Sequence, residues 1–100
     1  MVKIIWTLQA VKDLDNIAEF IAKDSVKYAR LTVQNIRIKT RILKENAFLG
    51  RVVPESGIKE IRELIFGNYR IIYQVNSKDL VSILTIHHSA RQLSYIDLPR

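Results

Sequence analysis

The sequence contains no cysteine, and this absence removes several classes of protein at once. Disulfide scaffolds, zinc knuckles, iron–sulfur centres and thiol nucleophiles all depend on cysteine. Glycine and proline are also scarce, with three and two residues, so linker-rich, collagen-like and low-complexity chains are excluded. No apolar run approaches the ~20 residues that span a bilayer, and the apolar start is too short for a signal peptide. We therefore expect a soluble, cytoplasmic protein.

What the chain does contain is an ordinary globular composition. Its 100 residues are 48% apolar and 26% charged, which is the balance of a folded domain rather than of a disordered segment. This length predicts a single domain over residues 1–100. A domain of this size without disulfides or metal staples depends on core packing for its stability.

The charge of the chain is concentrated in one segment. Sixteen basic and ten acidic residues give a net charge of +6. The basic residues between positions 27 and 44, where no acidic residue occurs, are Lys27, Arg30, Arg37, Lys39, Arg41 and Lys44. Such a concentration favours an anionic partner, whether a nucleic acid, the ribosome or an acidic protein segment. The alternative is a solvated helix face that keeps the protein soluble.

The hydrophobic pattern predicts the order of the secondary structure. Apolar residues recur at helical spacing over two segments, and β-branched and aromatic residues dominate four others. We expect a strand at 2–6, helices at 9–23 and from the Ser25 cap to about Asn46, and strands at 58–66, 69–75 and 80–88. Glycine and proline mark 50–57 as a loop, and Gly67-Asn68 suits a tight hairpin turn. The sequence therefore predicts an α+β fold with an N-terminal strand, a helical hairpin and a three-stranded antiparallel meander, its helices on one face of the sheet.

The second predicted helix is apolar on two sides. Its main stripe is Ala29, Val33, Ile36, Thr40, Leu43 and Ala47. At about 100° per residue, Leu31, Ile38 and Ile42 fall on nearly the opposite face, and most of the basic residues form a seam between the two. We favour an arrangement in which one side packs on the sheet and the other on the first helix. The alternative is an exposed strip for a partner or a second copy.

An ordered set of short motifs carries a resemblance to a known family. These motifs are Trp6 in the first strand, Ala10, Asp13, Leu14 and Ile17 in the first helix, Gly50-Arg51 and Pro54-Glu55 in the loop, IREL at 61–64, YRIIY at 69–73, and His88, Arg91 and Leu93 near the end. With this order of elements, the chain resembles the RelE/ParE superfamily of toxins from bacterial type II toxin–antitoxin systems. The match extends over nearly the whole chain.

The resemblance implies a toxin that is neutralised by a cognate antitoxin in a hetero-oligomeric complex. Antitoxins of this kind lay an otherwise disordered helix or strand over apolar grooves of the toxin. Leu31, Ile38 and Ile42 are therefore candidates for antitoxin binding, and an acidic antitoxin tail would suit the basic helix. Specific DNA reading in such systems belongs to the antitoxin, so we expect no sequence-specific DNA binding by this chain itself.

The superfamily holds two activities, and one is metal-free cleavage of mRNA on the ribosome by RelE-like members. That chemistry needs a base, cations for the phosphate and an acid. By resemblance, Glu55 is the candidate base and Arg70 the phosphate-binding cation. Arg62 is a candidate for a second cation. The His or Tyr that commonly closes the nuclease site is replaced here by Ser89 and Ala90. The remaining candidate acids are His87, His88 and Tyr95.

The other activity is inhibition of DNA gyrase by ParE-like members, and the incomplete nuclease set favours this branch. Arg70 and Arg91 then serve the fold, for example by pairing with Glu63. The candidate target-binding surface is basic: Lys27, Arg30, Arg37, Arg41, Lys44 and Arg91. A ribosome-dependent mRNA endonuclease is the alternative, and a member that has lost toxicity is a third possibility. Two adjacent histidines without cysteine make a poor ligand set, so we expect neither a metal nor another cofactor.

Overall fold

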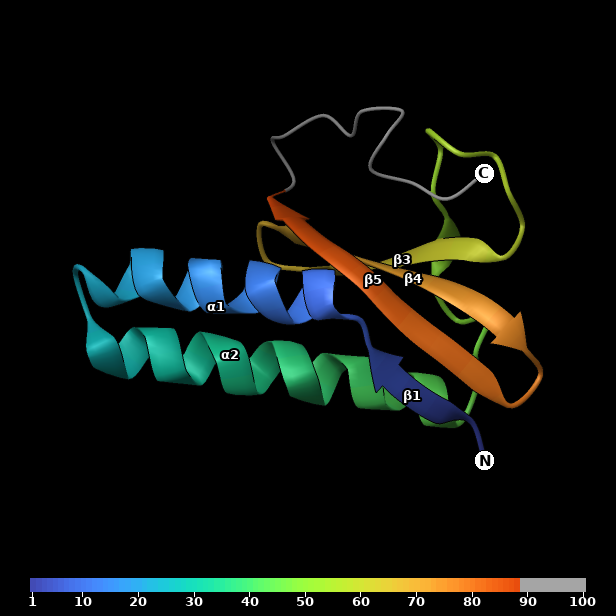
Figure 1. Cartoon of the computed structure of the whole chain (residues 1–100), viewed down its shortest axis with the longest axis horizontal. Coiled ribbons are helices and arrows are strands. Elements are labelled where there is room, and N and C mark those ends of the chain that lie inside the picture. The colour runs from blue at the N-terminus through green and yellow to red at the C-terminus, as the bar shows by residue number, and fades with distance from the viewer. Residues whose placement is uncertain (89–100) are drawn as a thin grey trace.

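The structure is a computed structural model that describes residues 1–88 (Figure 1). In chain order, its elements are β1 (Lys3–Trp6), α1 (Leu8–Ala22), α2 (Val26–Thr40), the 3-10 turn η1 (Arg41–Lys44), β2 (Arg51–Val52), β3 (Ile61–Phe66), β4 (Tyr69–Ser77) and β5 (Leu80–His88). The predictions from the sequence for Ser89, Ala90, Arg91, Leu93 and Tyr95 therefore lie outside the described residues.

The strands form one mixed sheet in the order β1-β5-β4-β3-β2. The antiparallel meander of β3, β4 and β5 is confirmed, and the α+β fold class with it. β1 joins the sheet in parallel with β5, and α1, α2 and the meander provide the long connection that parallel strands require. The antiparallel description thus holds for the meander but not for the first strand.

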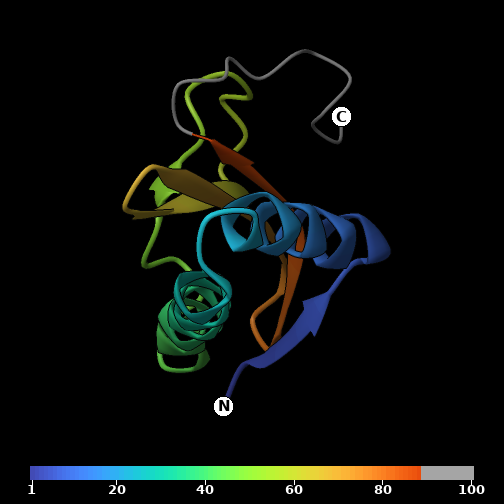
Figure 2. The ribbon, with the colours of Figure 1, turned by 90° about the vertical axis from the view of Figure 1, so that its left-hand side faces the viewer.

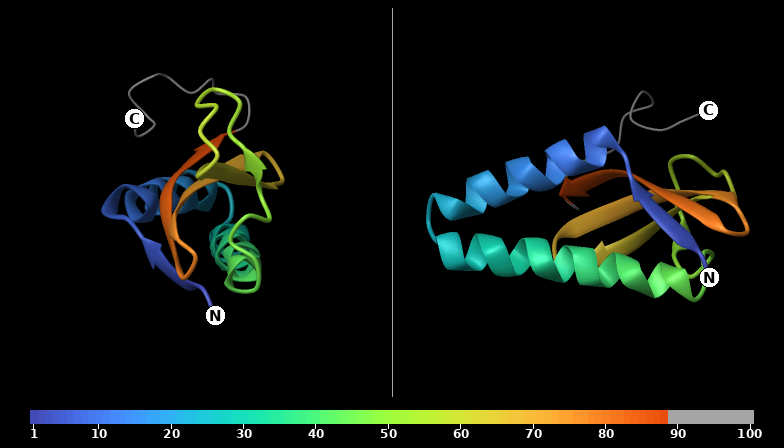
Figure 3. Two further views of the ribbon diagram at one scale, coloured as in Figure 1. Left: turned by 90° about the vertical axis from the view of Figure 1, so that its right-hand side faces the viewer. Right: turned by 60° about the horizontal axis from the view of Figure 1, so that its bottom comes forward.

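Both helices lie on the same face of the sheet, as predicted (Figure 2). α1 packs along β5, and α2 lies nearer to β3 (Figure 3). Their shared core contains Leu14 of α1, Ile36 of α2 and Tyr73 of β4, all of them almost fully buried. Most residues of the stripe predicted for the second helix are buried in this core. The helical periodicity therefore identified the buried face correctly.

Two hydroxyl groups fix where the helices begin. The Thr7 hydroxyl accepts the N–H of Ala10 at 3.1 Å and lies 2.8 Å from the carbonyl oxygen of Ile83, to which it donates. Thr7 therefore caps α1 and ties that cap to β5. Ser25 caps α2 by accepting the N–H of Tyr28 at 3.0 Å, as the sequence predicted.

The second helix ends earlier than predicted, because its last turn tightens. α2 stops at Thr40, where the side-chain hydroxyl donates to the carbonyl of Arg37 at 2.7 Å. The N–H of Arg41 bonds three residues back to Ile38, and the chain continues as η1 rather than as an α-helix to Asn46. Leu43 still enters the core from this turn.

The strand predicted at 58–66 also begins late, because β3 starts at Ile61, and the loop over 50–57 contains the short strand β2. The segment after β2 crosses the face of the sheet that the helices leave open, which we call the outer face. There Val53 packs with Ile61 and Ile72, and Ile58 and Leu84 border this small cluster. The loop thus gives the sheet a second apolar layer.

Within residues 1–88, no helix is long and apolar enough to cross a membrane.

Candidate functional site

The outer face carries a buried cluster of charges centred on Arg70. The Arg70 Nη1 and Nη2 atoms donate to the two carboxylate oxygens of Glu55 at 2.7 and 2.8 Å, and Nε donates to Glu63 at 2.6 Å. The second oxygen of Glu63 accepts from Nε of Arg51 at 2.5 Å. Each nitrogen of the Arg70 guanidinium is therefore bonded to a carboxylate. We call these four residues the outer-face ion cluster.

The register of the strands explains why these side chains meet. Arg70 is paired with Ile65 in β3, two residues from Glu63, so Arg70 and Glu63 are diagonal neighbours on one face. Arg51 of β2 stands directly opposite Glu63. Glu55 reaches the same place from the loop after β2, and its bidentate bond holds that loop on the sheet.

Burial divides the outer-face ion cluster into an inner pair and an outer pair. The side chain of Glu63 is 0% exposed and that of Arg70 is 9% exposed, whereas Arg51 is 63% exposed. The hydrogen bond to Glu55 raises the pKa of Arg70 above its ordinary value, against the opposing effect of burial, and Glu63 raises it further. Arg70 is thus a permanent cation whose charge is matched inside the fold.

The residues of the nuclease hypothesis divide between the two faces of the sheet. Glu55 and Arg70 meet on the outer face, and His87, paired with Arg70 in the register, lies there as a buried residue. His88 points to the helix face, where its ring meets the edge of Tyr69. Arg62 also belongs to the helix face, because it neighbours Glu63 in β3.

Arg62 binds the segment that connects η1 to β2 through hydrogen bonds to its backbone. Its Nη1 donates to the carbonyl oxygens of Phe48 at 3.1 Å and Gly50 at 2.8 Å, and its Nε donates to that of Lys59. The guanidinium also lies 4.8 Å from the centre of the Phe48 ring. Arg62 therefore stands apart from Arg70 and does not supply it with a second cation.

A second buried contact, between Gly50 and Tyr73, was not found by sequence reasoning. The N–H of Gly50, directly before β2, donates to the Tyr73 hydroxyl at 2.9 Å, and this hydrogen bond is buried. Burial raises the pKa of the Tyr73 phenol, although the bond from Gly50 acts in the opposite direction. The only signal in the sequence was Gly50 itself, because a glycine can mark a close approach of the backbone to another group.

The surface of α2 differs from the favoured prediction. Leu31, Ile38 and Ile42 are 44%, 53% and 38% exposed, so neither α1 nor the sheet covers them. The interpretation that both apolar sides pack inside the domain is wrong, because the main stripe packs in one core with both α1 and the sheet. The alternative, an exposed apolar strip, is what the structure shows. We call these three residues the α2 strip.

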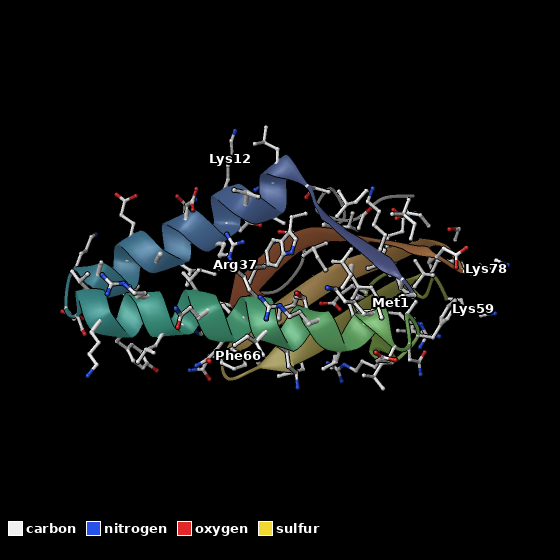
Figure 4. All side chains as sticks on the ribbon, turned by 90° about the horizontal axis from the view of Figure 1, so that it is seen from below. Met1, Lys12, Arg37, Lys59, Phe66 and Lys78 are labelled. Atoms are coloured by element: carbon white, nitrogen blue, oxygen red, sulfur yellow. The ribbon has the colours of Figure 1, made fainter. Side chains whose placement is uncertain are left out.

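The predicted basic surface is exposed as well. Lys27, Arg30, Arg37, Arg41 and Lys44 all lie open to solvent. Arg37 is on the side of α2 that faces β1, where its guanidinium lies 5.7 Å from the centre of the Trp6 ring (Figure 4). In the part of the chain that the structure describes, no group of three or more His, Asp or Glu is placed to hold a metal ion.

The chain is similar to known toxins over nearly its whole length. The family model described as "ParE toxin of type II toxin-antitoxin system, parDE" matches residues 4–93. The protein named "Putative toxin Y4kP" from Sinorhizobium fredii (strain NBRC 101917 / NGR234) is 37% identical over 92 residues, covering 90% of this chain and 91% of that protein. A solved structure titled "Chromosomal ParDE TA system from P. aeruginosa" has a TM-score of 0.73 at 26% identity, covering 88% of this chain and 96% of that one.

Proposed function

The chain belongs to the ParE toxin family of type II toxin–antitoxin systems, and from this membership we propose that it stops bacterial growth by binding DNA gyrase and is neutralised by a cognate antitoxin. The proposed action takes place in the cytoplasm, where gyrase acts. It requires a binding surface on the toxin, without a catalytic site and without a cofactor.

The observation that favours gyrase over mRNA as the target is that the Arg70 guanidinium is already bonded to carboxylates of the protein. All three nitrogens of its guanidinium donate to Glu55 and Glu63. An RNA phosphate would have to displace a bidentate carboxylate to reach this cation. Arg62 lies on the other face of the sheet and is engaged with backbone carbonyls, so it adds no cation at Arg70. This arrangement supports a structural role for Arg70 and a toxin that acts by binding.

The proposed target is tested by a supercoiling assay with purified toxin. We expect the toxin to inhibit supercoiling by DNA gyrase and excess antitoxin to restore it, while mRNA on stalled ribosomes stays intact. Growth arrest on induction of the toxin alone establishes that the preparation is toxic. Arrest with uninhibited gyrase and cleaved mRNA would overturn the proposal in favour of the endonuclease. Absence of arrest would indicate a member that has lost toxicity.

For neutralisation, we propose that an amphipathic helix of the antitoxin docks on the α2 strip. The strip is apolar and exposed, and basic residues precede each of its members in the sequence: Arg30, Arg37 and Arg41. At its N-terminal end, Leu31 borders a hollow of about 350 Å³ that Tyr28, Phe66 and Tyr69 also line. An apolar helix face with acidic flanks would match both the strip and the positive charge beside it.

Replacing Ile38 with glutamate is expected to weaken antitoxin binding at least thirtyfold, because a charge would enter the apolar contact; this corresponds to about 2 kcal/mol. Binding is measured by calorimetry with the purified antitoxin. The matched control is Leu8→Glu, which places the same charge on a 70% exposed apolar residue at the start of α1. The control should bind normally, and unchanged affinity of Ile38→Glu would exclude the α2 strip as the antitoxin site.

A further inference from the structure

The arginines of the described chain, taken together with Lys44, fall into two groups. Arg51, Arg62 and Arg70 are bonded to carboxylates or backbone carbonyls and are used by the fold. A second group, on α2 and η1, is exposed and forms no ion pair within residues 1–88: Arg30, Arg37, Arg41 and Lys44. We call this second group the α2 ridge. Its positive charge is directed to solvent.

The α2 ridge is a straight row on one side of the helix. At about 100° per residue, Arg30, Arg37 and Arg41 fall within a sector of about 40°. Lys44 continues the row, because residues three apart eclipse one another in the 3-10 turn. The rise per residue makes the row about 22 Å long. Each member of the α2 strip lies about 100° further round, so the two surfaces are adjacent but distinct.

Few acidic groups oppose this charge. None occurs between Lys27 and Lys44 in the sequence. Glu19 of α1 lines the same shallow groove as Arg30, and Glu45 follows Lys44 directly. Among residues 1–88, no carboxylate is bonded to Arg37 or Arg41, which form the middle of the row. The ridge is therefore most positive at these two arginines.

We propose that the α2 ridge binds the phosphate backbone of duplex DNA without reading its sequence. A rigid, straight row of cations suits a rigid rod of evenly spaced phosphates, and guanidinium groups hydrogen-bond phosphate well. Single-stranded nucleic acid needs open aromatic rings on which bases stack, whereas Trp6, the ring beside the ridge, is half-buried under Arg37. An amphipathic protein helix would be centred on the apolar strip. The proposal goes beyond gyrase inhibition and does not depend on it.

The test measures binding of the full-length toxin to fluorescently labelled 20-base-pair duplexes of two unrelated sequences, by anisotropy at several salt concentrations. Four released counterions predict a slope of log K against log salt of about −3.6, or roughly a 150-fold loss of affinity between 50 and 200 mM salt. In the double variant Arg37→Gln/Arg41→Gln, the slope should fall to about −1.8 and the loss to roughly 12-fold. Both sequences should give the same result.

The matched control is Lys12→Gln/Lys78→Gln, which has the same net charge. Figure 4 places Lys12 on α1 and Lys78 at the far end of the sheet, both away from the ridge. This control should keep a slope near that of the unaltered protein. An equal fall in both double variants, a salt-independent affinity, or tighter ridge-dependent binding of single-stranded RNA or of an acidic peptide would overturn the proposal. Since the assay contains no gyrase, its failure leaves the proposed target unaffected.

Discussion

Replacing Arg70 with methionine is expected to lower the free energy of unfolding by about 3–5 kcal/mol. The change leaves the carboxylate of Glu63, whose side chain is 0% exposed, without its buried partner. It also releases Glu55, which holds the loop after β2 on the outer face. Chemical denaturation followed by circular dichroism measures the effect. A marginally stable domain of this size would lose much of its folded population.

The control for this prediction uses the other partner of Glu63. Arg51 bonds the same carboxylate but is 63% exposed, so Arg51→Met should lower the free energy of unfolding by no more than about 1 kcal/mol. The double variant Glu63→Leu/Arg70→Met removes the buried charge altogether and should recover much of the lost stability. A stable Arg70→Met protein would show that Arg70 is kept for binding or chemistry, and the nuclease hypothesis would regain its central cation.

Gly50→Ala is expected to lower the free energy of unfolding by about 3 kcal/mol, because overpacking and a broken buried hydrogen bond combine. A Cβ atom at this position would lie 2.4 Å from the backbone oxygen of Glu63 and 2.8 Å from the Tyr73 hydroxyl. Neither group moves easily, since one belongs to β3 and the other is fully buried in β4. Thermal and denaturant unfolding both report the change.

Gly57 provides the matched control for Gly50. It has a positive φ of 63°, but a Cβ atom there would meet nothing within 4 Å. Gly57→Ala should therefore cost only the backbone preference, about 1 kcal/mol. If the two variants unfold alike, the close approach at Gly50 is relaxed at little cost and the prediction is wrong. Tyr73→Phe separates the hydrogen bond from the steric effect, because it keeps the ring.

The sequence was sufficient for the elements whose pattern is local. The stripe of α2 and the cap at Ser25 follow from spacing and side-chain chemistry within a few residues. The parallel pairing of β1 with β5 depends on partners that are 77 residues apart, as with Lys3 and Leu80, and no local pattern encodes it. The early end of α2 was missed because the buried periodicity continues through η1 to Leu43.

In the candidate site too, some contacts could be predicted from the sequence and others depend on how distant segments come together. Pairing of Arg70 with Glu63 was anticipated as part of the ParE-like interpretation, and the hydrogen bond between them at 2.6 Å confirms it. The contribution of Glu55 was not anticipated as a partner of Arg70, because a loop carries it across the outer face. Nor did alternation along β3 enter the nuclease hypothesis, although it places Arg62 and Arg70 on opposite faces.

The position of β5 between β1 and β4 has a consequence for the order in which the chain folds during its synthesis. β5 is the last strand in the described sequence, yet it pairs on one side with the first strand and on the other with the meander. During synthesis, β1 and α1 emerge long before β5, on which they pack. The hydrogen bond from the Thr7 hydroxyl to the carbonyl of Ile83 forms only once β5 is present. Such distant contacts form late in folding. The sheet, and with it the surface on which α1 packs, is therefore completed only after β5 has been synthesised.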